Sequence, residues 1–156
     1  MAEETPLVVI RRGDAAEGAR LKELAIASKA HWGYDLERVR EWADQGDFTP
    51  AALQKLALFV AEIDGRAIAW ASVEPRGETA WLADLWVEPQ WIGNGIGSRL
   101  FGEAAEHARG AGARALEWEA EPNALGFYEK MGARPVGESR SEWGRMLSVM
   151  RVELDA

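Results

Sequence analysis

Short runs of apolar residues, separated by turn-forming residues, recur along the chain and predict strands. These strands cover residues 7–10, 56–63, 66–74, 81–87, 113–120, 135–139 and 146–154. Elsewhere apolar residues line one helical face and predict helices over residues 14–30, 97–109 and 123–131, with two more beginning at Asp35 and Pro50. The resulting order, β-α-α-β-β-β-α-β-α-β-β, is that of a mixed α/β chain without an internal repeat.

Residues at the ends of these segments support their boundaries. Asp14 can cap the first helix, and Gly132 can end the last one. Asp64 and Gly65 suit the two-residue type I′ turn of a hairpin, because both central positions of that turn need a positive φ. Residues 56–74 are therefore predicted to form a tight antiparallel pair of strands.

Length and composition indicate one globular domain over residues 1–156, with enough apolar residues for a core. No apolar run approaches the roughly 20 residues that span a bilayer, and the acidic N-terminal residues 1–5 do not resemble a signal peptide. We therefore expect a cytoplasmic protein. Cysteine is absent and histidine occurs only twice, so neither a disulfide nor a bound metal is expected.

The formal net charge of −8 disfavours nucleic acid or an anionic membrane as a partner. Neutralising phosphates requires an excess of basic residues, which this chain lacks. A cationic small substrate is compatible with the negative charge, although acidity is also common in soluble proteins for solubility alone. The charge therefore excludes some partners without identifying one.

A glycine-rich turn between the strand 81–87 and the following helix has the character of a phosphate site. Its alternate glycines lack the Cβ atoms that would keep a ligand from the backbone. The N–H groups and positive dipole end of the helix point back at the turn. A phosphate or pyrophosphate is the ligand that such a turn favours. The turn comprises Ile92, Gly93, Asn94, Gly95, Ile96, Gly97 and Ser98.

Three segments together resemble the GNAT superfamily of acetyl-CoA-dependent N-acetyltransferases. They are Leu85-Trp86-Val87-x-Pro89, Gly93-Asn94-Gly95-Ile96-Gly97 and Asn123-Ala124-Leu125-Gly126-Phe127-Tyr128-Glu129-Lys130-Met131-Gly132-Ala133. The resemblance covers the chain from about residue 56 to its end. It implies a single central mixed, mostly antiparallel sheet of about six or seven strands, with splayed central strands and flanking helices. The segments 31–34 and 144–147 resemble a bacterial branch of the superfamily with less specificity.

The resemblance also implies how acetyl-CoA is held as co-substrate. Its pantetheine arm would pair with backbone groups near Leu85 and Val87, as an added strand does. Its pyrophosphate would rest on the amides of residues 93–98, and Ser98 would add a hydroxyl donor. Asn123 would cap the short helix, contact the arm, or do both, and Phe127 would pack against the arm or the core.

For the chemistry, Tyr128 matches the family position of the acid that protonates the leaving thiolate. A phenol stays protonated at neutral pH, because its ordinary pKa is about 10. The alternative is that Tyr128 only packs the short helix against the sheet.

Two positions depart from the family pattern. Ile92 stands where many members carry Arg or Gln, which removes a side-chain contact to phosphate. Ala83 stands where relatives carry a glutamate, so the base must come from elsewhere. Asp84, Glu117 and Glu119 are the candidates, with structural pairing to arginine as the alternative and proton loss through water as another.

The acceptor pocket is predicted at His31, Trp32 and Tyr34, because the loop between the first two helices commonly shapes that pocket in this superfamily. The acceptor would be a primary amine of a small molecule or peptide. A non-catalytic acyl-CoA-binding domain is the alternative function. A nucleotide-binding Rossmann protein fits poorly, because the glycines of the Rossmann fingerprint follow a first strand near the N-terminus. The resemblance also implies that a homodimer is possible, which agrees with the twofold symmetry of most oligomers.

Overall fold

A computed structural model describes residues 7–141 and 143–154. The acidic residues 1–5, interpreted above as lacking signal-peptide character, lie outside this range. Internal contacts divide the chain into two compact units. The first unit comprises Met1–Ser72 and Asp84–Glu103, and the second comprises Val73–Ala83 and Ala104–Ala156. The expectation of a single domain stays a prediction.

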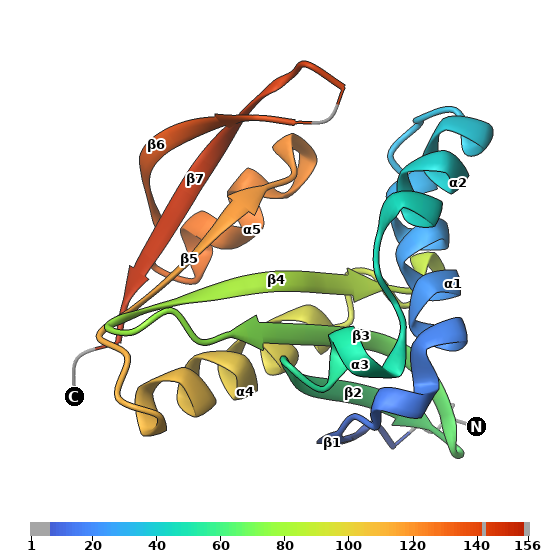
Figure 1. Cartoon of the computed structure of the whole chain (residues 1–156), viewed down its shortest axis with the longest axis horizontal. Helices are drawn as coiled ribbons and strands as arrows, with labels where there is room; N and C mark the ends of the chain where they lie inside the picture. Colours follow the sequence, from blue (N-terminus) through green and yellow to red (C-terminus); the bar gives the residue numbers. More distant parts are fainter. Residues whose placement is uncertain (1–6, 142, 155–156) are drawn as a thin grey trace, which may run out of the picture. The chain divides into compact units, whose positions relative to one another are not determined.

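Seven strands form a mixed sheet in the order β1-β2-β3-β4-β5-β7-β6, which confirms the predicted fold class (Figure 1). Pairing is parallel between β4 and β5, and antiparallel in the pairs β1–β2, β5–β7 and β6–β7. The strands are β1 (Val9–Arg12), β2 (Ala57–Ile63), β3 (Arg66–Glu74), β4 (Thr79–Val87), β5 (Ala115–Ala120), β6 (Arg134–Arg140) and β7 (Met146–Glu153).

Helices occur at each place that the sequence predicts, and the short helix η2 (Pro89–Trp91) was not predicted. The others are η1 (Ala15–Glu17), α1 (Gly18–Ala30), α2 (Leu36–Gln45), α3 (Pro50–Leu53), α4 (Ile96–Gly110), η3 (Pro122–Ala124) and α5 (Leu125–Lys130). Asp14 caps the first of them as expected, accepting a hydrogen bond from the Ala16 amide, and Glu17 completes a capping box. Among the described residues, no helix has both the length and the apolar character of a membrane span.

The core of the first unit lies under α1. Leu21, Leu24 and Ala25 occupy the buried side of this helix and cluster with buried residues of β2 and β3. Trp70 of β3 is almost fully buried, and its Nε1 donates a hydrogen bond to the Leu21 carbonyl at 2.9 Å. Helix and strands are thus joined by packing and by one satisfied indole donor.

The hairpin between β2 and β3 turns at the predicted dipeptide. Asp64 has a φ of 51° and Gly65 a φ of 79°. Both angles lie in the left-handed region that a type I′ turn requires, so the predicted turn chemistry is confirmed.

In the second unit, β5 forms the centre of the packing. Leu116, Trp118 and Ala120 are buried, and β5 pairs along its whole length with β7. Its parallel ladder with β4 is much shorter, joining Thr79, Ala80 and Trp81 to Ala115, Leu116 and Glu117.

Candidate active site

The glycine turn of the first unit has the backbone conformation that its sequence predicts. Gly93 has a φ of 89° and Gly95 a φ of 79°, values that residues with a Cβ adopt only under strain. A Cβ built at either position would meet no other atom within 4 Å. The outer surface of the turn is therefore open, and its main chain is exposed to an incoming ligand.

Helix α4 starts directly from this turn. The Arg99 amide donates to the Gly95 carbonyl at 3.1 Å, which closes the first turn of the helix. The amides of residues 96–98 come before that bond, so the helix offers them no carbonyl partner. They lie at the positive end of a 15-residue helix, where a phosphate is favoured. These residues fit the diphosphate of acetyl-CoA.

Neighbouring groups hold the turn in place. The Asn94 side chain donates to the Trp91 carbonyl at 3.2 Å. Just before the turn, Glu88 is paired with Arg20 of α1 at 2.9 Å, and its amide donates to the Ile68 carbonyl. Ile92 is 36% exposed and carries no hydrogen-bonding group. The Ile92 side chain therefore cannot bind a phosphate, whereas the backbone amides and the Ser98 hydroxyl can.

Asp84 lies on β4 and accepts two hydrogen bonds from neutral groups. Ser72 Oγ donates to one carboxylate oxygen at 2.6 Å, and Trp86 Nε1 donates to the other at 3.0 Å. Burial raises the pKa of Asp84 above its usual range, and the two hydrogen bonds only partly oppose that shift. The result is a fixed carboxylate with an enhanced tendency to take up a proton.

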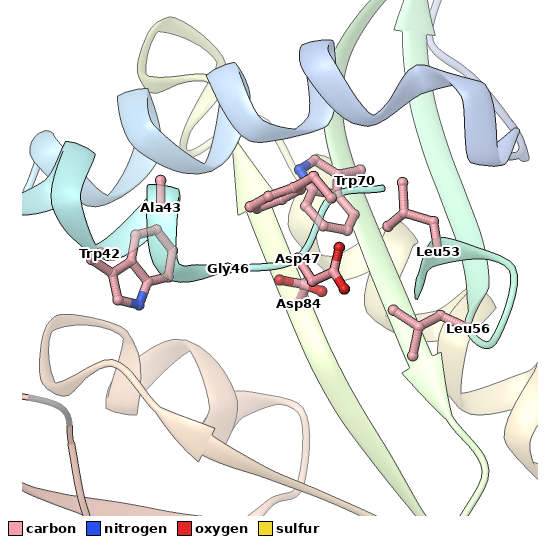
Figure 2. A pocket seen from close by; sticks show the side chains of 9 residues that line it. Trp42, Ala43, Gly46, Asp47, Leu53, Leu56, Trp70 and Asp84 are labelled. Carbon is pink, nitrogen blue, oxygen red and sulfur yellow. The ribbon is translucent and has the colours of Figure 1, made fainter. Parts of the chain in front are cut away.

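A cavity of about 170 Å³ opens beside Asp84 within the first unit (Figure 2). Aromatic and aliphatic side chains make most of its wall, and two carboxylates complete it. The lining residues are Trp42, Ala43, Gly46, Asp47, Phe48, Leu53, Leu56, Trp70 and Asp84. Phe48 stands edge-on to Trp70, with ring centroids 6.2 Å apart, which fixes one side of the cavity.

The acceptor role predicted for His31, Trp32 and Tyr34 stays a prediction. His31 and Trp32 contact each other through their rings at 4.9 Å, in the turn that follows α1. Neither they nor Tyr34 are among the residues that line the cavity. Sequence reasoning selected Asp84 but missed the aromatic wall, because Trp42 and Trp70 follow the same apolar pattern as core residues.

In the second unit, Tyr128 of α5 is buried against two aromatic rings. Its ring centroid lies 4.9 Å from that of Trp118 and 5.1 Å from that of Phe127. Burial raises the pKa of the Tyr128 phenol, and the negative charge of Glu121 adds to the shift. The phenol is therefore protonated throughout the neutral range and can act as a donor.

The other two base candidates both lie on β5. Glu117 is paired with Arg151 of β7 at 2.8 Å, so the structural alternative holds for this residue. Glu119 is exposed and accepts a hydrogen bond from Ser139 Oγ at 2.9 Å. Of the three candidates, only Asp84 lines the cavity.

The predicted cap at Asn123 is wrong in its position. Glu121 caps η3 instead, accepting from the Asn123 amide, and Pro122 starts the turn with its fixed φ. The Asn123 side chain donates to Glu121 at 2.7 Å. Helix α5 then begins one turn later and has no side-chain cap. The cofactor contact expected of Asn123 stays a prediction.

A model of the acetyltransferase (GNAT) family matches residues 21–133, which is more than half of the chain. The chain belongs to this family. The resemblance inferred from the three segments is thereby confirmed. Among the described residues of this GNAT protein, no group of three or more histidine, aspartate or glutamate side chains is placed to hold a metal ion.

A curated relative of this GNAT protein is an uncharacterized N-acetyltransferase from Methanocaldococcus jannaschii. It is 28% identical over 121 residues, which are 70% of this chain and 54% of that protein. The chain thus spans about half the length of the curated relative that it matches.

Solved structures share the fold over almost the whole chain. The PaiA N-acetyltransferase from Thermoplasma acidophilum, in complex with coenzyme A, has a TM-score of 0.78 at 17% identity, covering 94% of this chain and 99% of that chain. A GCN5-related N-acetyltransferase from Rhodopseudomonas palustris has a TM-score of 0.79 at 23% identity, covering 98% of each chain. At these identities the likeness shows the fold alone.

Proposed function

We propose that the protein is an acetyl-CoA-dependent N-acetyltransferase that acts on a primary amine of a small molecule or peptide. The observation that carries the proposal is the open glycine turn ahead of α4, in a chain of the GNAT family. The coenzyme A in the PaiA structure supports acetyl-CoA as the donor. The net charge of −8 supports an acceptor other than nucleic acid or membrane.

In this proposal the turn binds the diphosphate of acetyl-CoA through main-chain amides. Ser98 adds a hydroxyl, and backbone groups at Leu85 and Val87 pair with the pantetheine arm. Phe127 and Asn123 contact the same arm. Each of these roles is carried mainly by the backbone or by packing, which agrees with the lack of a phosphate-binding side chain at Ile92.

The acetyl group passes directly from the thioester to the amine within a ternary complex. The amine nitrogen attacks the carbonyl carbon, a C–N bond forms, and the C–S bond breaks. Tyr128 gives its proton to the leaving thiolate. The amine loses a proton to Asp84, with Glu119 and a chain of waters as the alternatives. We further propose that the protein acts in the cytoplasm, as its lack of cysteine suggests.

A non-catalytic acyl-CoA-binding domain is the second candidate. Ala83 and Ile92 favour it, because each replaces a polar side chain that many relatives carry.

Two measurements on the purified chain separate these functions. Calorimetric titration with coenzyme A tests the donor site, and release of free thiol from acetyl-CoA with a panel of amines tests transfer. We expect both coenzyme A binding and amine-dependent thiol release. Binding without release above the blank would instead establish the non-catalytic domain, and absence of binding would overturn both.

A further inference from the structure

The cavity of the first unit is the size of one ring. Its volume of about 170 Å³ is close to that of an engineered apolar cavity of about 150 Å³ that holds benzene. Trp42, Phe48 and Trp70 supply aromatic surface, and Leu53 and Leu56 supply aliphatic surface. A single ring or a branched alkyl group matches this volume.

The two charged residues that line the cavity are both acidic. Asp47 and Asp84 both belong to the wall, and none of the nine lining residues is basic (Figure 2). Asp47 stays ionised, because hydrogen bonds from Thr49 lower its pKa. The two donors to Asp84 are neutral, so they hold its carboxylate in one orientation without cancelling its charge. A cation that enters the cavity would compensate the negative charge of Asp84.

Ser72 explains why Asp84 points in this direction. Its side chain lies on β3, is fully buried, and reaches the Asp84 carboxylate at 2.6 Å. Trp86 binds the other oxygen from the same face of β4 and also packs edge-on against Trp42, with ring centroids 5.4 Å apart. The carboxylate and the aromatic wall are therefore parts of one connected arrangement.

We infer that this cavity is the acceptor site and that it selects primary amines whose apolar part is a single ring or a branched alkyl group. That the bound amine is the acetyl acceptor rests on the proposed function. The class of amine that binds is inferred from the cavity alone. The ammonium group pairs with Asp84, and the apolar part packs against the aromatic wall. Linear diamines leave the wall unfilled, and carboxylates of the same shape are repelled.

Calorimetric titration tests the ligand class with three probes of defined chemistry. They are 2-phenylethylamine, the oppositely charged 3-phenylpropanoate, and butane-1,4-diamine, each added to the free protein and to protein saturated with coenzyme A. We expect 2-phenylethylamine to bind at least tenfold more tightly than either other probe in at least one of the two states. Equal binding of amine and carboxylate, or no amine binding in either state, overturns the inference.

Variants tie the binding to the cavity. Asp84→Asn should weaken 2-phenylethylamine binding at least tenfold, while Leu36→Ala, at an exposed position of α2, should leave it unchanged. Phe48→Ala should enlarge the cavity and gain affinity for 2-(1-naphthyl)ethylamine. That gain cannot arise from misfolding. Unchanged binding in Asp84→Asn, or no gain in Phe48→Ala, counts against the cavity.

The outcomes separate this inference from the proposed function. If the protein binds the amine but not coenzyme A, the cavity is an amine site and the proposed acetyltransferase function is refuted. In another outcome, the protein binds coenzyme A and releases thiol only with amines that lack a ring or branch. The proposed acetyltransferase activity would then stand, but the cavity would not be its acceptor site.

Discussion

A single methyl group added to the glycine turn should act on the ligand more than on the fold. Gly95→Ala places a Cβ where phosphate would approach, and we expect coenzyme A affinity to fall at least tenfold, about 1.4 kcal/mol. Gly77→Ala is a matched control, because Gly77 also has a positive φ of 74° and open space around it. Calorimetry should show the loss in Gly95→Ala alone. Equal losses in both variants would mean that backbone strain is the cause.

Removing the Tyr128 hydroxyl should separate chemistry from binding. A positioned general acid contributes roughly 10²–10⁴-fold to rate, so we expect Tyr128→Phe to lower kcat by at least about 10²-fold. The phenylalanine ring keeps the contacts with Trp118 and Phe127, so coenzyme A affinity should stay within about twofold. Steady-state kinetics and calorimetry measure the two quantities. A kcat equal to that of the parent would reduce Tyr128 to a packing residue.

The raised pKa of Asp84 predicts a pH dependence of stability with a definite sign. The folded state holds the proton more tightly than the unfolded state, whose carboxyl has a pKa of about 3.9. The stabilising contribution is therefore complete below about pH 3.9 and is lost as the pH rises through the folded pKa. Asp84→Asn lacks this loss, so its Tm relative to the parent should increase between pH 4 and pH 8. A Tm difference that is independent of pH would contradict the assignment.

At the scale of elements, the capping box at the start of η1 offers a clear test. The Asp14 side chain accepts a hydrogen bond from the Ala16 amide, and the Glu17 carboxylate accepts one from the Asp14 amide at 2.8 Å. Asp14→Ala should cost about 1 kcal/mol in the free energy of unfolding. Asp44→Ala breaks only an exposed ion pair with Lys22 and should cost less than about 0.5 kcal/mol. Urea denaturation measures the free energy of unfolding of both variants. A larger loss in Asp44→Ala than in Asp14→Ala would contradict the stabilising role of the cap.

At the scale of the whole molecule, the sequence predicted what local chemistry determines. Asp64-Gly65 and the Gly93–Gly95 pair require positive φ, so their turns follow from residue type alone. The order of the strands along the chain followed from apolar runs, and the type of sheet followed from the family resemblance. The cavity did not, because Trp42 and Trp70 have the same spacing whether they fill a core or line a space. The cap at Glu121 was missed because Pro122 moves the helix start by one turn.

Successive side chains of β4 point to opposite faces of the strand. Asp84, which lines the cavity, and Trp86, which donates a hydrogen bond to Asp84, project from one face of β4, and the alternating residues Leu85 and Val87 project from the opposite face because the strand is pleated. A one-residue deletion upstream of Asp84 would invert this assignment and turn the carboxylate away from the aromatic wall. Indels in this strand should thus be far less tolerated than point substitutions.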